Sequence, residues 1–103
     1  MWAQLITGRL KPGREGDLIR LDEELHQLEQ ADSGLIRQLL MRDQKDPNRV
    51  YTVVVLESEE KARARESDPR RQEGLQPLRA LMAEIFDGPP EFVDLDVLKE
   101  FVP

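Results

Sequence analysis

The chain has 103 residues, a length that suits one domain with a single hydrophobic core, which we expect to span residues 1–103. Hydrophobic residues make up 39% and charged residues 35%, and the formal net charge is −6. This acidic balance repels phosphate backbones and anionic lipid, so it argues against nucleic acid and membrane surfaces as partners. The sequence has no cysteine, which excludes disulfides and thiolate metal sites and is compatible with the reducing cytoplasm where we expect the protein.

A strand and an amphipathic helix are the first predicted elements. Residues 2–10 alternate as a strand does, and Lys11-Pro12-Gly13 is a turn sequence that ends it. Residues 14–31 predict a helix, with its acidic side chains mostly on the other side of the helical wheel from a stripe of leucines, namely Leu18, Leu21, Leu25 and Leu28. Gly34 is typical of the turn that follows such a helix.

Two further strands are predicted at residues 35–42 and 49–57, joined as a hairpin by residues 43–48. The stretch from Val50 to Leu56 is apolar or β-prone on both faces, so both faces of its sheet have to be covered. A chain this short covers one face with its own helices. The pattern therefore predicts a homodimer with Tyr51, Val53 and Val55 at the interface.

A second helical run begins after Ser58, whose hydroxyl can cap it. Asp68 interrupts the run and offers a second cap, with Pro69 in the first-turn position. The run reaches residue 86, and Pro77 inside it predicts either a kink or a regular part confined to the residues after this proline. The Gly88-Pro89-Pro90 sequence then ends it.

A fourth strand is predicted at residues 92–98, where Asp94 and Asp96 alternate with apolar residues. The order of elements is then β-α-β-β-α-β. This order predicts an α+β, ferredoxin-like antiparallel sheet with helices on one face, in which the first and third strands are central. The two aspartates would lie on an edge strand, where charge opposes edge-to-edge aggregation, and no third carboxylate or histidine near them suggests a metal site.

Five short sequences in order carry a resemblance over nearly the whole chain: Leu10-Lys11-Pro12-Gly13, Asp46-Pro47-Asn48-Arg49, Glu57-Ser58-Glu59-Glu60, Ser67-Asp68-Pro69 and Gly88-Pro89-Pro90. Together they resemble the antibiotic biosynthesis monooxygenase family of dimeric α+β barrels. The resemblance implies that two protomers face their sheets together, with helices outside and a pocket between each protomer's sheet and helices. That family includes cofactor-free oxygenases of phenols or quinols and haem-degrading enzymes.

The chain departs from both branches at the positions that carry their chemistry. The haem-degrading branch uses an asparagine, a tryptophan and a histidine, and the matching positions are approximately Ile6, Leu56 and Gly74. In the cofactor-free branch, a tryptophan, an aromatic residue and a histidine are replaced by Leu56, Ala62 and Arg65. The resemblance therefore implies no haem, and we expect no cofactor and no metal.

Candidate pocket residues follow from the two-residue period of the central strands. One side of the first strand carries Trp2, Gln4 and Ile6, and the side of the third strand that faces the family's pocket carries Thr52, Val54 and Leu56. An apolar pocket with an indole, an amide and a hydroxyl suits a flat organic molecule. The alternative for Trp2 is that it fills the core.

Two charged side chains have competing interpretations. Arg65 can pair with an anionic ligand, or it can belong to a solvated helical face with Arg63, Arg70 and Arg71. His26 is the only histidine and lies beside the leucine stripe of the first helix, where we interpret it as a flank residue without a catalytic role.

These observations lead to two hypotheses for the function, and neither identifies catalytic residues. The first is a cofactor-independent monooxygenase-like protein that acts on a small aromatic or quinol-type molecule. The second, from a different class, is a catalytically silent dimeric module that binds such a ligand.

Overall fold

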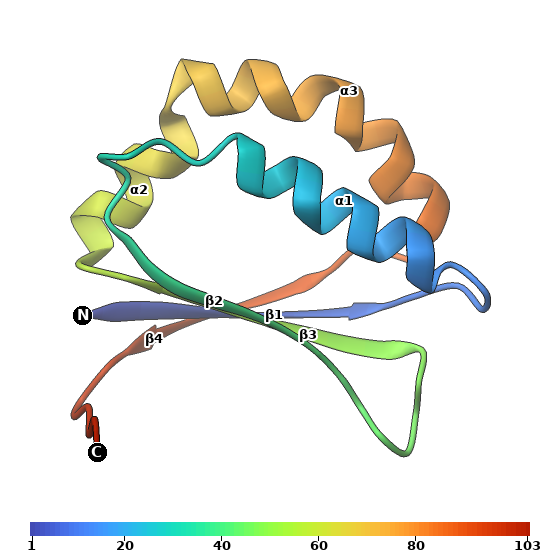
Figure 1. Cartoon of the computed structure of the whole chain (residues 1–103), viewed down its shortest axis with the longest axis horizontal. Coiled ribbons are helices and arrows are strands. Elements are labelled where there is room, and N and C mark those ends of the chain that lie inside the picture. The colour runs from blue at the N-terminus through green and yellow to red at the C-terminus, as the bar shows by residue number, and fades with distance from the viewer.

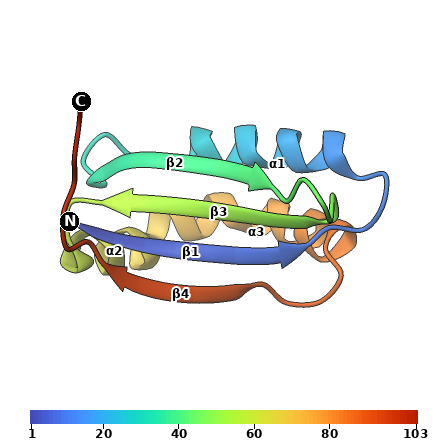
Figure 2. The same ribbon diagram turned by 90° about the horizontal axis from the view of Figure 1, so that it is seen from below.

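The computed structural model describes all residues from Met1 to Pro103 as an α+β fold. The elements in chain order are β1 (Trp2–Arg9), α1 (Glu15–Gln27), β2 (Leu35–Arg42), β3 (Arg49–Leu56), α2 (Glu59–Ser67), α3 (Pro69–Ile85) and β4 (Glu91–Asp96). The strands form one antiparallel sheet in the order β2-β3-β1-β4, and the helices cover one face of it (Figures 1 and 2). The predicted ferredoxin-like architecture, with β1 and β3 central, is confirmed.

Several predicted boundaries differ from the structure by a few residues. Strand β1 ends one residue early, because Leu10 instead forms an isolated bridge with Phe86. Helix α1 ends at Gln27, four residues short of the prediction. The Leu28 and Glu29 N–H groups donate to carbonyls three residues back, at 3.1 Å each, which tightens and closes the last turn.

The second helical run is divided where its caps predict. The Ser58 hydroxyl accepts the Lys61 N–H at 3.1 Å, and the Asp68 carboxylate accepts the Arg70 N–H at 2.9 Å. Asp68 has extended backbone and separates α2 from α3. Helix α3 is continuous on both sides of Pro77, so the expectation that its regular part is confined to the residues after this proline is wrong.

The buried core has two parts. Leu10, Leu18, Leu21, Val50 and Ile85 form one cluster beneath α1 and α3. The second cluster lies at the α2 end of the sheet and contains Trp2, Val54, Leu56 and Ala62. A cavity lies between the helices and the central strands, and it is the candidate site.

The other face of the sheet has no helix over it, as Figure 2 shows. Because side chains alternate along a strand, the residues of β3 that do not face the helices are Tyr51, Val53 and Val55. Strand pairing places Leu39, Val53, Leu5 and Val93 in one row across all four strands. The residues predicted for a dimer interface thus lie on an uncovered apolar surface. None of the helices combines the length and apolar character needed to cross a membrane.

Candidate functional site

A cavity of about 910 Å³ lies between the helices and the covered face of the sheet. Its size is that of a pocket for a small organic ligand. Much of its lining is apolar and comes from the sheet and from α1 and α3, for example Ile6, Leu25, Leu40, Val54, Met82 and Phe92. Gly8 contributes by its lack of a side chain, because a Cβ there would lie 3.2 Å from the Phe86 ring.

Five of the residues proposed from sequence line this cavity, namely Gln4, Ile6, Thr52, Val54 and Arg65. The strand register explains the first four. Ile6 lies opposite Thr52 and Gln4 lies opposite Val54 on the neighbouring strands β1 and β3, so their side chains meet on the covered face. Thr52 thus supplies a hydroxyl to a mostly apolar wall.

Trp2 and Leu56 are absent from the cavity lining and belong to the second core cluster. They pair across the end of the sheet that α2 covers, and they are only 4% and 2% exposed. The Arg63 guanidinium lies 5.2 Å from the centroid of the indole ring. For Trp2, the structure therefore favours the core interpretation over the pocket interpretation, because α2 seals this end of the sheet.

The polar group of Gln4 is already engaged at the cavity edge. Its Nε2 donates to Asp94 at 3.0 Å, and the other Asp94 oxygen accepts from Arg63 at 2.8 Å. The hydrogen bond from Arg63, then that from Gln4, lowers the pKa of Asp94. The interpretation of Asp94 as an edge charge alone was incomplete, because this carboxylate also joins β4 to α2.

A charged cluster formed by Glu29, Arg65 and Arg71 lines part of the cavity. Arg65 donates two hydrogen bonds to the Glu29 carboxylate, at 2.8 Å from Nε and 2.7 Å from Nη2. Arg71 approaches the same carboxylate, with its Nη1 3.9 Å from Oε1. The three side chains are between 13% and 18% exposed, so the interpretation of Arg65 and Arg71 as part of a solvated helical face is wrong.

The pKa values of Glu29 and Arg71 in this cluster are shifted by different causes. Burial acts to raise the pKa of Glu29, but hydrogen bonds from Arg65 and Ser33 and the charges of both arginines outweigh it and lower that pKa. The Arg71 pKa is lowered by burial and then by repulsion from Arg65. Its Nη1 is buried without a hydrogen-bond partner. Such an orphan donor costs on the order of 1–3 kcal/mol.

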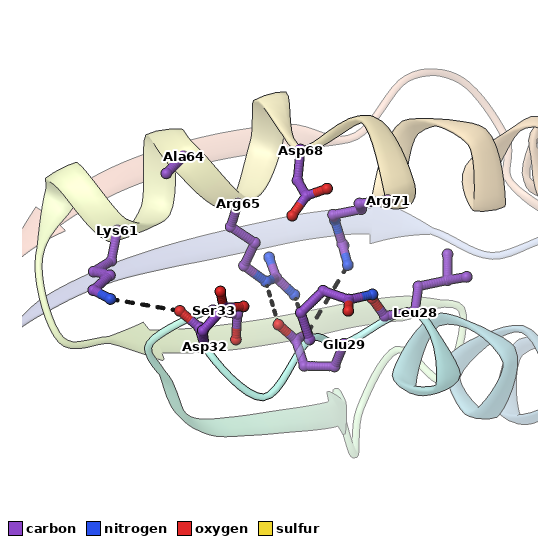
Figure 3. A pocket seen from close by; sticks show the side chains of 10 residues that line it. Leu28, Glu29, Asp32, Ser33, Lys61, Ala64, Arg65, Asp68 and Arg71 are labelled. Atoms are coloured by element: carbon purple, nitrogen blue, oxygen red, sulfur yellow. Dashed lines mark hydrogen bonds and ion pairs between the residues drawn. The ribbon is translucent and has the colours of Figure 1, made fainter.

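The same three residues also line a smaller cavity of about 210 Å³, bounded by α2, α3 and the segment after α1. Figure 3 shows the arginines reaching down from the helices toward Glu29. The cluster therefore forms part of the walls of both cavities.

His26 lies on the flank of α1, as predicted, but it also reaches the large cavity. Its Nε2 is 3.7 Å from an Asp22 carboxylate oxygen, and the side chain is 50% exposed. Gln38 donates to the other Asp22 oxygen at 3.3 Å. The cavity therefore has an imidazole and a carboxylate at its edge.

The residues present do not fit the haem arrangement of the resembling family. Gly74 lies at the position that resemblance assigns to the histidine, and a Cβ added to it would be 2.3 Å from a Leu28 methyl group. A larger side chain there requires Leu28 to move. The structure also contains no group of three His, Cys, Asp or Glu side chains placed to hold a metal ion.

Sequence reasoning did not select Glu29 or Arg71, although the helical period contains a clue to both. Arg71 precedes Leu75 by four residues and so continues the apolar stripe of α3, and Glu29 follows Leu25 by four residues. A charged residue in line with an apolar stripe is a candidate for a buried, paired role.

Comparison with known proteins shows the fold. No family model and no curated protein matches the chain. Among solved structures, an antibiotic biosynthesis monooxygenase has a TM-score of 0.72 and 15% identity, with 96% of this chain and 100% of that chain covered. A protein from Bordetella bronchiseptica, provisionally named as the same kind of monooxygenase, has a TM-score of 0.73 and 23% identity, with 95% and 97% covered.

A mutant of MhuD with two manganese protoporphyrin IX molecules bound per active site has a TM-score of 0.81 and 16% identity, with both chains covered completely. At these identities the likeness concerns the fold alone. The chain thus has the fold of the antibiotic biosynthesis monooxygenase structures, as the sequence resemblance predicted.

Proposed function

We propose that the chain binds a small aromatic or quinol-type molecule in the large cavity and oxidises it with molecular oxygen, without metal, flavin or nicotinamide. The observation that carries this proposal is the cavity itself, whose lining combines apolar side chains with polar and charged ones. The apolar side chains suit a flat ring system, and the polar ones suit its oxygen substituents. The names of several structures with this fold support the reaction class.

The proposed chemistry needs little from the protein beyond binding and removal of one proton. In an anthrone, a ring-activated CH₂ group loses a proton, and the resulting anion supplies electrons to O₂. One oxygen atom enters the product as a carbonyl, the other leaves as water, and the CH₂ hydrogens go to that water. His26, to which the sequence assigned no catalytic role, lines the cavity with Asp22 3.7 Å away and is therefore the candidate proton acceptor in this proposal. The apolar walls desolvate the anion.

The second candidate function is a binding module without catalysis. It is favoured by the way the polar groups at the cavity are already engaged: Gln4 bonds to Asp94, and Arg65 bonds to Glu29. These two side chains are held by the protein and are not free to act on a substrate. The Thr52 hydroxyl and His26 then remain for a reaction.

Oxygen uptake separates the two functions. Wild type, Thr52→Val and His26→Ala are assayed against a panel of anthrones and quinols in the presence of a metal chelator, with Arg20→Met as the control. Arg20 is an exposed α1 residue outside the cavity, paired with Asp17 at 3.1 Å. We expect chelator-resistant uptake that both cavity variants reduce by about tenfold or more and the control does not.

Uptake that the chelator abolishes, or that neither cavity variant changes, would refute the proposed reaction. Saturable binding of the same compounds without oxygen uptake would select the binding module. We also expect haemin not to be degraded, and loss of its Soret band under reducing conditions would contradict that expectation.

The proposed assembly is a homodimer that buries the open face of the sheet. Exposed apolar side chains on that face support it, with Leu39 at 49%, Val93 at 46% and Leu95 at 43% exposure. The C-terminal residues add further apolar surface, since Leu98 is 95% and Phe101 is 83% exposed. A contiguous apolar surface that spans four strands is typical of a protein interface.

A further inference from the structure

Arg71 differs from the other arginines near the cavity because no carboxylate accepts a hydrogen bond from it. Its Nη1 is buried without a hydrogen-bond partner, and the nearest approach to Glu29 is 3.9 Å, beyond hydrogen-bond distance. A buried guanidinium normally has its donors satisfied, so this one calls for an explanation.

The carboxylates around Arg71 are all engaged by other arginines. Both oxygens of Glu29 accept from Arg65, at 2.7 and 2.8 Å. Of the other carboxylates that line the two cavities, Glu66 pairs with Arg63 at 3.2 Å and Asp68 with Arg70 at 2.6 Å. Asp32 lies 3.7 Å from Arg70, and Asp22 lies 3.7 Å from His26. The protein thus holds a positively charged side chain in the cavity wall that has Glu29 as a neighbour but no carboxylate hydrogen-bonded to its Nη1.

We propose that Arg71 binds an acidic oxygen of the ligand, so that the molecule held in the large cavity is an aromatic anion. This inference rests on the proposed binding of an aromatic molecule there. The ligand's ring system lies against the apolar wall from Leu75 and Met82, and its anionic group reaches the charged cluster. A charge-assisted hydrogen bond in a low-dielectric site is strong and selects the anion over its neutral analogue.

The Arg65–Glu29 pair positions Arg71 in this scheme. Glu29 attracts Arg71 without satisfying its Nη1, and Arg65 keeps Glu29 ionised and fixed. An incoming anion then meets a donor whose side chain is already partly ordered, which lowers the entropic cost of binding.

The test uses two fluorescent probes that share a skeleton and differ in charge. Anilinonaphthalene sulfonate carries an anionic group, and phenylnaphthylamine is its uncharged parent. Affinities are measured by fluorescence titration for wild type, Arg71→Met and Arg20→Met, the last removing one exposed positive charge elsewhere. We expect Arg71→Met to weaken the sulfonate probe by about tenfold and to leave the uncharged probe within about twofold. Arg20→Met should change neither.

Thr52→Phe locates the binding, because it places a ring in the cavity, and circular dichroism checks that this variant folds. If Thr52→Phe leaves the binding of both probes intact, they bind outside the cavity and the proposed function fails. If it abolishes binding but the wild type and Arg71→Met bind the sulfonate equally, the cavity stands and the role of Arg71 is overturned.

The melting temperatures of wild type and Arg71→Met without ligand show whether Arg71 instead contributes to the stability of the fold. A residue kept for a ligand rather than for stability should leave the melting temperature unchanged or raised when its orphan charge is removed. A clear fall in melting temperature would assign Arg71 to the fold and overturn the proposal.

Discussion

The covered and open faces of this sheet are built from the same strands but have different surfaces. On the covered face, the alternating positions include polar residues such as Gln4 and Thr52, and the helices above leave a cavity. On the open face, the row from Leu39 through Val53 and Leu5 to Val93 is entirely apolar. An apolar row on an uncovered face therefore favours a protein interface, whereas polar side chains on a covered face favour a ligand site.

The largest expected effect comes from placing a charge on the open face. Val53 lies opposite Leu5 and Leu39, so Val53→Asp would put a carboxylate at the centre of the proposed interface. Burying an unpaired charge costs several kcal/mol, and we expect a monomer or an unfolded chain. Light scattering and sedimentation measure this. Ile19→Asp is the matched control, since Ile19 is 53% exposed on α1. A Val53→Asp protein that remains dimeric, or a wild type that is monomeric, would contradict the proposed assembly.

A smaller but still large effect is expected at the sealed end of the covered face. Trp2 is 4% exposed and packs with Val54, Leu56 and Ala62. Trp2→Ala should lower the free energy of unfolding by about 3–5 kcal/mol through lost contacts and a residual cavity. Urea denaturation followed by circular dichroism measures it. If stability is retained but binding of the aromatic probes is lost, Trp2 acts in the site and the core interpretation is wrong.

The two cavity arginines should respond in opposite ways. Arg65→Met leaves the Glu29 carboxylate largely buried without its bidentate partner, and should cost about 2 kcal/mol. Arg71→Met removes a donor whose Nη1 has no hydrogen-bond partner and whose nearest carboxylate oxygen is 3.9 Å away, so it should cost little. Thermal and urea denaturation of the two variants side by side measure the contrast. Equal losses would show that both arginines serve the fold alike.

The smallest expected effect is a dependence on acid at the cap of α3. Arg70 and the backbone lower the pKa of Asp68 to about 2 in the folded chain, against about 3.9 for an unfolded aspartate. A depressed folded pKa stabilises above the unfolded value, so this contribution is present at neutral pH and is lost as pH falls from about 4 toward 2. Asp68→Asn keeps a cap acceptor without the charge. The stability difference between wild type and this variant should shrink over that window, and a difference independent of pH would contradict the assignment.

The order of helices and strands was predictable from sequence because turns and helix caps depend on residues close together in the chain. Turn glycines such as Gly34, with φ of 81°, and the caps at Ser58 and Asp68 act over a few residues, so they can be read directly. Strand alternation likewise placed Gln4 and Thr52 on the cavity side. Alternation did not predict that Trp2 lies in the core and not in the cavity. It assigns a residue to a face of the sheet, but it does not show that α2 covers the end of that face where Trp2 lies.

The cluster of Glu29, Arg65 and Arg71 could not be predicted from local sequence, because its members come from distant segments. Arg65 takes its partner, Glu29, from a segment 36 residues earlier, and only the packing of α2 beside the segment after α1 brings them together. Side-chain charge alone does not distinguish Arg65 and Arg71 from exposed neighbours such as Arg63 and Arg70. Burial and partner geometry distinguish them, and both are properties of the assembled fold.

The strand order also has a consequence for how the chain folds. Strand β1 comes first in the sequence, yet its neighbours β3 and β4 lie far along it, and Trp2 pairs with Leu56 on one side and Asp96 on the other. Only β2 and β3 close over a short connection. Pairings between distant segments pay a larger loop-closure entropy and slow folding, so the β2–β3 hairpin should form early and β1 should be enclosed late. Until β4 docks, the apolar residues of β1 have an unpaired strand edge beside them, which makes the late intermediate the species most prone to aggregate during synthesis.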